Sequence, residues 1–329
     1  MPSLSRIKQR LSSSDALFAT YSTLTKPFAK SLRHLGTPPS IPANPEKVSV
    51  AIPNYNYKDF LKARAKSILN QTYPLYELII LDDASTDGSG QYIEQELLPI
   101  IRTKNPDLKV KFIKNSKNSG KSIFQWQKAF KEATGDFLWL AEADDLSDPN
   151  FLATVMSKFS SQNVVLSFAN SAAINPRGAF MTYDFANRSV DKLKSGRFKS
   201  DFIVDGKKII TKEFAINCII PNVSSCVFRL DSKIPYQKYL SSALDFVQCG
   251  DWYFYLKVLE HGKLAYSRAA LNLFRIHPNS VTAATKKTKT ILLEVKKIHA
   301  LIAEEYSLAP DIKLAMEREA SRIANRLVV

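Results

Sequence analysis

The chain has 329 residues, of which 45% are hydrophobic and 23% are charged, and its formal net charge is +15. This composition excludes a largely disordered chain and suffices for one large domain or one domain with appendages. The three cysteines, Cys218, Cys226 and Cys249, lack zinc-type spacing and are too few for a disulfide scaffold, which suits a reducing compartment. No apolar run reaches about 18 residues, so we expect no membrane-spanning helix.

Residues 1–46 are expected to form a basic arm that ends in a Pro-rich linker, "PPSIPANPEK". They show neither the apolar core nor the cleavage site of a secretory signal. A flexible lead-in and an arm that touches an anionic membrane or a partner protein are both open. The positive charge also permits nucleic acid. However, the sequence has no zinc finger, RNP-type aromatic pair or helix-turn-helix pattern, so we expect no nucleic-acid partner.

From residue 47 to residue 162, strand patterns alternate with helix patterns. The predicted strands are 48–53, 77–83, 108–115 and 136–145, and the predicted helices are 57–71, 89–102, 122–134 and one that starts at Pro149. Asn56 and Asp148 are the predicted N-caps of the first and last of these helices. The alternation predicts βαβ units, a mostly parallel sheet, and a ligand site at the carboxyl ends of its strands.

Acidic residues follow two of these strands. Asp82 and Asp83 end the second strand, and Glu142, Asp144 and Asp145 end the fourth. Two carboxylates about 4 Å apart repel by roughly 4 kcal/mol at an effective dielectric constant of about 20, so a compensating partner is expected. Either these residues are solvated and cap the next helix, or they hold a hard divalent cation such as Mg²⁺ or Mn²⁺. The sequence has neither a Walker A nor a Rossmann glycine motif, which disfavours kinases and dehydrogenases.

Residues 163–282 follow a different pattern. Strand-like segments at 163–174, 178–185, 222–230, 263–267 and 271–277 accompany a basic polar stretch and a helix at 250–262. Residues 283–329 are predicted to form two amphipathic helices. Because neither the arm nor these helices carry a catalytic motif, we expect both to serve location or assembly rather than chemistry.

Four segments together resemble the family 2 inverting glycosyltransferases, which have the glycosyltransferase-A fold. The opening segment is "VSVAIPNYNYKDFLKARAKSILNQTYPLYELIILDDASTDGS", and "GDFLWLAEADD" is similar to the metal-binding D-x-D region of that family. "CGDWYFYLKVLEHGKLAY" is similar to the segment that carries the catalytic base, and "FRIHPNSVT" is similar to the closing motif. The resemblance implies one α/β domain of this type, with the nucleotide-sugar bound by residues 47–162 and the acceptor and base in residues 163–282.

The resemblance also implies a donor site at the strand ends. Pro53 and Tyr55 would border the nucleobase pocket, and Asp83 would hydrogen-bond the base or its ribose. Asp82 would shape the same turn. Lys121, in "NSGKS", would approach the uracil or a phosphate.

The residues that carry the chemistry come from the other motifs. By resemblance, Asp144 would face the donor ribose or sugar, Asp145 would hold Mn²⁺ or Mg²⁺, and His277 would meet the metal or the diphosphate. Asp251 would be the catalytic base. Many members of the family have an acidic residue where this chain has Gly250, which leaves Asp251 as the one acidic candidate at that motif.

Other readings stay open at several of these positions. Asp83 and His277 could simply be turn residues, and Lys121 could be solvated. Asp251 could cap its helix, because Gly-Asp before an apolar run is a cap signal. Trp252 could form an acceptor platform or pack inward.

The expected activity is metal-dependent, inverting transfer of a sugar from a nucleotide-diphospho-sugar to a hydroxyl group of a glycan or glycolipid. By resemblance the setting is bacterial cell-surface polysaccharide or glycolipid assembly, in the cytoplasm or at the inner face of the plasma membrane. One alternative is a nucleotide-sugar-forming nucleotidyltransferase, but "PNYNYKD" is not its Gly-rich basic loop. The other is a non-catalytic basic adaptor that binds nucleotide or membrane, which the intact Asp83, Asp145 and Asp251 disfavour.

Overall fold

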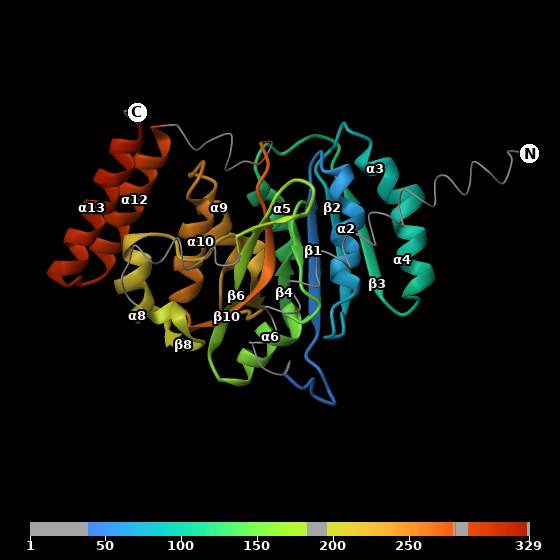
Figure 1. Ribbon diagram of the computed structural model, residues 1–329, viewed down its shortest axis with the longest axis horizontal. Coiled ribbons are helices and arrows are strands. Elements are labelled where there is room, and N and C mark those ends of the chain that lie inside the picture. The colour runs from blue at the N-terminus through green and yellow to red at the C-terminus, as the bar shows by residue number, and fades with distance from the viewer. Residues whose placement is uncertain (1–38, 183–195, 279, 281–288, 328–329) are drawn as a thin grey trace, which may run out of the picture.

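The computed structural model describes residues 39–182, 196–278, 280 and 289–327. Within these residues ten strands form one mixed sheet. The strands are β1 Val48–Asn54, β2 Glu77–Asp82, β3 Lys109–Lys114, β4 Phe137–Leu140, β5 Leu146–Ser147, β6 Val164–Ile174, β7 Phe180–Thr182, β8 Phe202–Asp205, β9 Cys226–Arg229 and β10 Lys263–Arg275. Their order is β3-β2-β1-β4-β9-β6-β10-β5, with β7 beside β6 and β8 beside β10. The α/β class predicted from the sequence is therefore confirmed (Figure 1).

The part of the sheet that precedes residue 163 is mostly parallel, as predicted. β2 pairs in parallel with β3 and with β1, and β1 pairs in parallel with β4. All residues of β1 and β2 are buried, which explains why both strands are almost continuously apolar. The register places Asn54 opposite Asp82, so the carboxyl ends of these two strands are level.

The second half joins this sheet through β9, which runs antiparallel to both β4 and β6. The prediction of separate strands at 263–267 and 271–277 was wrong, because Lys263–Arg275 form the single strand β10. This strand pairs in parallel with β6 and shifts its register on both sides of Ala270. Such a bulge leaves residues unpaired without ending the strand, so the sequence shows two strand patterns where the structure has one strand.

The α-helices stand between or after the strands, and short 3₁₀ and π segments adjoin them. They are α2 Lys58–Leu69, α3 Ser89–Tyr92, α4 Leu98–Lys104, α5 Ser122–Glu132, α6 Phe151–Ser157, α8 Gly206–Ile209, α9 Tyr236–Ala243, α10 Gly250–Leu259, α12 Thr290–Glu305 and α13 Pro310–Leu327. The short segments are η1 Ile93–Leu97, η2 Lys158–Ser160, η4 Arg197–Lys199, η5 Ile210–Phe214 and η6 Val223–Ser225.

Three local predictions need correction. Asn56 does not cap α2: it has a φ of 58°, and its side-chain oxygen accepts a hydrogen bond from Thr86 N at 2.8 Å. Asp148 does not cap α6, which begins at Phe151; its Oδ1 accepts from Asn150 N at 2.8 Å. β4 ends at Leu140, before the acidic residues, which therefore lie in the turn that follows the strand.

The two larger apolar cores among the described residues lie on opposite faces of the sheet, because successive side chains of a strand point to opposite sides. Ala51 of β1 belongs to one core and its neighbour Ile52 to the other. Trp126 and Trp139 are both buried, in opposite cores. Trp252 is also buried and packs inward, since its Nε1 donates to Phe214 O at 3.1 Å. It is therefore not an acceptor platform.

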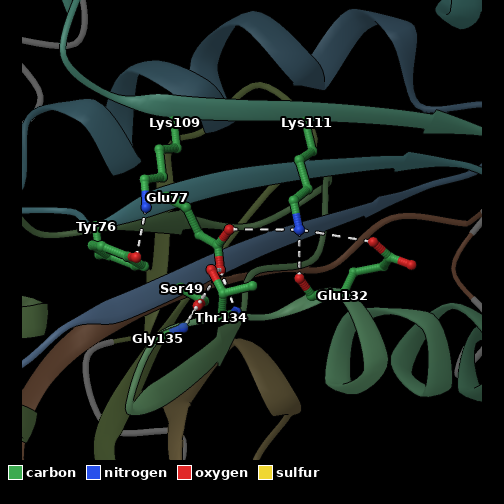
Figure 2. A network of polar contacts seen from close by, with 8 residues as sticks. All are labelled: Ser49, Tyr76, Glu77, Lys109, Lys111, Glu132, Thr134 and Gly135. Carbon is green, nitrogen blue, oxygen red and sulfur yellow. Dashed lines mark hydrogen bonds and ion pairs between the residues drawn. The ribbon is translucent and has the colours of Figure 1, made fainter.

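A buried carboxylate holds the amino-terminal ends of the first strands together (Figure 2). Glu77 Oε1 accepts hydrogen bonds from Ser49 Oγ at 2.6 Å and from Thr134 N at 2.5 Å. Lys111 Nζ lies 3.9 Å from Glu77 Oε2 and donates to Glu132 O at 2.7 Å. This network ties β1, β2 and β3 to the end of α5, at the edge of the sheet opposite the acidic strand ends.

The C-terminal part of the chain forms the two predicted helices, α12 and α13. They lie at the opposite end of the molecule from α4 and β3 (Figure 1). The basic arm up to residue 38 and residues 183–195 of the second half lie outside the described residues. Among the described residues, no helix has both the length and the apolar character needed to cross a membrane.

Candidate active site

The ends of β1 and β2 are joined by side chains. Asn54 Nδ2 donates to Asp82 Oδ1 at 2.7 Å. Asp82 also accepts from Ser85 Oγ at 2.6 Å and from Ser85 N at 3.2 Å. Because Asp82 is fully buried and its oxygens are used in this way, its contribution is to hold the turn after β2.

Asp83 is also buried and is directed to a different loop. Its carboxylate accepts hydrogen bonds from Asn115 Nδ2 at 2.5 Å, from Ser119 Oγ at 2.6 Å and from Ser119 N at 3.0 Å. It therefore orders residues 115–121 instead of forming only a local turn. Pro53 is buried in β1, opposite Leu81 of β2, while Tyr55, just after the strand, is 43% exposed.

The acidic segment after β4 divides into two parts. Glu142 points toward α5, where its Oε1 accepts from Trp126 Nε1 at 2.7 Å. Asp145 is 2% exposed, and its Oδ1 accepts from Arg275 N at 2.9 Å while its Oδ2 accepts from Asn222 Nδ2. Burial raises the pKa of Glu142 to about 8, and burial and the charge of Asp144 raise the pKa of Asp145.

Asp144 faces the other way and meets the closing motif. Its Oδ2 lies 3.0 Å from His277 Nε2, and Arg275 Nε donates to its backbone oxygen at 2.5 Å. The rings of Tyr57 and Phe60 each lie 5.5 Å from the His277 ring, so aromatic side chains enclose the pair. The structure thus brings His277 to Asp144, whereas both oxygens of Asp145 are engaged by other residues.

Positive charge compensates the acidic segment from within the protein. Arg64 of α2 is fully buried, and its Nη1 donates to Ser147 Oγ at 2.9 Å. Its guanidinium carbon lies 5.2 Å from the centre of the Trp139 ring. Burial lowers the pKa of Arg64 to about 10, against the opposing pull of Asp145 and its acidic neighbours, so the side chain stays charged at neutral pH.

Sequence reasoning missed three residues of this site: Arg64, Asn222 and Arg275. Arg64 gave a signal, because it lies three residues after Leu61 and one before Ala65, on the apolar face of its helix. A charged residue on such a face requires a buried partner. Asn222 and Arg275 gave no such signal, since their contacts depend on how β9 and β10 join the sheet.

The metal-ligating side chains at this site suit a divalent cation only if a bound molecule supplies further coordinating atoms. Among the described residues, no three His, Cys, Asp or Glu side chains are grouped closely enough to hold a metal ion alone. Mg²⁺ commonly takes one or two carboxylates together with substrate phosphates and water. Asp144 Oδ2 and His277 Nε2 supply one oxygen and one nitrogen within 3.0 Å of each other, which fits a cation whose remaining positions a diphosphate completes.

Asp251 is the second residue of α10, after Gly250, and Cys249 occupies the N-cap position. Asp251 Oδ1 accepts from Trp252 N at 2.7 Å, and the side chain is partly exposed. Burial of the carboxyl raises its pKa to about 6, and the charge of Glu294 acts in the same direction. The pKa of Asp251 is therefore higher than that of an ordinary aspartate.

Gly250 serves packing. A Cβ at this position would lie 2.5 Å from Ile123 Cδ1 and 2.8 Å from Ala243 O. The glycine therefore lets α10 approach α5 and α9 closely, and it leaves no space for the acidic residue that many family members have here. Trp126 of α5 joins the two parts of the site, because its ring lies 6.4 Å from that of Phe254 on α10 while its Nε1 bonds Glu142.

Lys121 is engaged within the protein. Its Nζ donates to Leu244 O at 2.5 Å and to Phe246 O at 3.2 Å, both in the segment before α10. These two contacts tie Lys121 to that segment. A cavity of about 530 Å³ lies nearby, lined by Lys114, Lys117, Lys128 and Lys131 among others, but none of the predicted site residues lines it.

Several of the segments that build this site match a protein-family model. The model of glycosyl transferase family 2 matches residues 49–216, about half of the chain. The chain belongs to glycosyl transferase family 2. The match includes the ends of β1 and β2 and the acidic segment after β4, and it stops before α10 and β10.

Several proteins that are similar in sequence to this chain are named glycosyltransferases. TuaG of Bacillus subtilis, named for teichuronic acid biosynthesis, is 23% identical over 261 residues, which are 78% of this chain and 91% of TuaG. An uncharacterized glycosyltransferase of Nostoc, alr2836, is 34% identical over 119 residues, which are 36% of this chain and 34% of that protein. WfgD of Escherichia coli, a UDP-Glc:alpha-D-GlcNAc-diphosphoundecaprenol beta-1,3-glucosyltransferase, is 27% identical over 39% of this chain and 47% of its own length.

Solved structures of glycosyltransferases share the fold. The mannosyltransferase PcManGT of Pyrobaculum calidifontis, in complex with GDP-Man and Mn²⁺, superposes with a TM-score of 0.56 at 16% identity and covers 94% of this chain and 79% of its own. TarS 1–349 of S. aureus, in complex with UDP-GlcNAc, has a TM-score of 0.53 at 18% identity and covers 86% of this chain and 71% of its own. These likenesses confirm the glycosyltransferase-A type of domain predicted from the motifs.

Proposed function

We propose that this family 2 glycosyltransferase moves a sugar, with inversion, from a nucleotide-diphospho-sugar to a hydroxyl group of a glycan or glycolipid, assisted by Mn²⁺ or Mg²⁺. The observation that carries the proposal is the pairing of Asp144 with His277 at the strand ends, at 3.0 Å, while the carboxylate of Asp251 stands on a separate element, α10. A direct displacement needs two separate sites, one that holds the leaving group and one that carries the base.

The donor would bind along the carboxyl ends of the strands. Exposed Tyr55 and buried Pro53 border the space for the nucleobase, and Asp83 orders the loop at residues 115–121 beside it. Asp144 and His277 would hold the cation, which when bound neutralises charge on the departing diphosphate. Asp145 supports this arrangement through Arg275 and Asn222.

Asp251 would accept the proton of the acceptor hydroxyl as that oxygen attacks the anomeric carbon. Its pKa, raised by burial to about 6, keeps the carboxylate ionised at neutral pH while making it a better proton acceptor than an ordinary aspartate. In this assignment residues 47–162 bind the donor, and residues 163–282 supply the acceptor side and the base. The same proposed division keeps residues 1–46 and residues 283–329 apart from the donor-binding and acceptor-binding parts.

The biological setting is proposed from the relatives. TuaG is named for teichuronic acid biosynthesis and WfgD for a diphosphoundecaprenol-linked acceptor, so assembly of a bacterial cell-envelope polysaccharide or glycolipid is the setting we propose. The solved structures contain GDP-Man and UDP-GlcNAc, which supports a nucleotide-sugar donor.

A donor screen tests this proposal. Wild-type protein is incubated with a panel of nucleotide sugars, with Mn²⁺ or with a chelator, and released nucleoside diphosphate is measured. We expect metal-dependent release with at least one donor. If no donor is hydrolysed and calorimetry detects no binding of nucleoside diphosphates with Mn²⁺, the assignment is wrong.

A further inference from the structure

The segment that leads into the proposed base is an irregular loop, Leu244–Cys249, between α9 and α10. Asp251 follows this loop by two residues, so the position of the loop fixes where the carboxylate stands. Loops are held less firmly than helices and strands unless their backbone polar groups find partners. Here those partners come from two distant parts of the chain.

The first partner is Glu294 of the C-terminal helix α12. Its Oε1 accepts from Val247 N at 2.6 Å, and its Oε2 accepts from Gln248 N at 2.8 Å and from Cys249 N at 2.9 Å. The side chain of Glu294 is only 7% exposed. One buried carboxylate thus satisfies three successive backbone N–H groups just before the first turn of α10, where negative charge is also favoured by the helix dipole.

The second partner is Lys121, from the segment between β3 and α5. Its Nζ donates to two backbone oxygens of the same loop, Leu244 O and Phe246 O. Phe246 is held further by Lys297 of α12, whose Nζ lies 4.5 Å from the ring centre, and by Tyr253, whose ring stacks at 5.3 Å. A cation therefore binds the carbonyl groups of the loop while an anion binds its N–H groups.

We propose that Glu294 and Lys121 form a clamp on residues 244–249 and are positioning residues for Asp251. This inference rests on the proposed function, because it takes Asp251 as the base. It assigns α12 a part in the active site, in place of the location or assembly role expected from the sequence. It also predicts that Lys121 affects sugar transfer without binding the donor.

The clamp is tested by amide hydrogen exchange, which does not depend on activity. We expect the Val247, Gln248 and Cys249 amides to be protected in the wild type and to exchange at least ~10-fold faster in Glu294→Ala, which leaves three N–H groups without their acceptor. Glu294→Gln keeps one acceptor oxygen and should lie between the two. Glu304→Ala, which removes an exposed carboxylate of the same helix, is the matched control and should leave these amides unchanged.

The positioning role is tested by kinetics on the same variants. We expect kcat for transfer to fall at least ~10-fold in Glu294→Ala and in Lys121→Met, with the donor KM and the affinity for nucleoside diphosphate unchanged, because a misplaced base affects only the chemical step. Glu294→Gln should recover part of the loss. Weaker nucleotide binding by Lys121→Met would instead place Lys121 at the donor and overturn its assignment.

The outcomes separate the two proposals. If exchange at residues 247–249 is the same in Glu294→Ala and in the wild type, the clamp is wrong whatever the activity. If exchange accelerates but kcat stays within two-fold, the clamp exists but does not position Asp251. If the wild type transfers no sugar from any donor, the proposed function fails, and the exchange result alone decides the clamp.

Discussion

Asp144 Oδ2 and His277 Nε2 lie 3.0 Å apart, although 133 residues separate them in the chain. One follows β4 and the other follows β10, so the sheet brings together two motifs that the sequence shows only separately. With the imidazole neutral, the pair offers one oxygen and one nitrogen ligand to a cation.

The first prediction concerns this pair. His277→Ala should weaken the Mn²⁺-dependent part of nucleoside diphosphate affinity by at least ~10-fold, because one cation ligand is lost. Asp144→Asn should do the same, while affinity measured without metal should change little in either variant. Calorimetry with and without Mn²⁺ provides the measurement. His261→Ala is the control, because it removes a histidine that is hydrogen-bonded to Tyr239 instead. If Mn²⁺ changes the nucleoside diphosphate affinity equally in the wild type and in all the variants, Asp144 and His277 do not hold the cation.

The second prediction concerns the base. Asp251→Asn should lower transfer by at least ~10²-fold, the lower end for loss of a general base, with nucleotide affinity preserved. Asp311→Asn, which changes an aspartate in the first turn of another helix, should transfer normally. Retained transfer in Asp251→Asn would move the search for the base to Glu142 or Asp245.

The third prediction follows from the pKa of Asp251. Because burial raises this pKa from 3.8 to about 6, the carboxylate is protonated and inactive below that pH and ionised above it. The value of kcat/KM for transfer, which reports ionisation of the free enzyme, should therefore rise with pH and level off above about 6 to 7. A rate that stays constant from pH 5 to pH 8, with the protein folded throughout, would exclude Asp251 as the titrating base.

The fourth prediction concerns Gly250. Gly250→Ala should destabilise the fold by about 1–3 kcal/mol, the usual cost of overpacking, because the new methyl group would meet Ile123 Cδ1 and Ala243 O. Urea unfolding measures the effect. Adding Ile123→Val removes one of the two clashing atoms and should recover part of the stability; an unchanged midpoint in Gly250→Ala would show that α10 has more room than the structure indicates.

The fifth prediction concerns the arm. A variant that begins at Pro45 should keep donor hydrolysis and bind anionic lipid vesicles more weakly, because it lacks the basic and apolar residues of the arm. Vesicle flotation and the release of nucleoside diphosphate are the two measurements. Equal vesicle binding removes the membrane role, and lost hydrolysis shows that the arm completes the active site.

The sequence by itself determined the parallel half of the sheet and the place of the site on it. β1 and β2 are buried on both faces, so their residues had to be apolar along the whole strand, and this pattern is readable without a structure. The polar residues at the ends of β1, β2 and β4 were equally readable, since the carboxyl ends of parallel strands meet at one edge of the sheet.

Only the tertiary structure decided what each of these polar residues contacts. Asn222 and Arg275 bind Asp145 because β9 and β10 enter the sheet beside β4 and β6, and Glu294 reaches the loop before Asp251 because α12 packs beside α10. The apolar pattern of a helix or strand specifies which face is buried but not which distant element covers it. The partners of a buried carboxylate follow from that choice, so they became visible only once the elements were packed together.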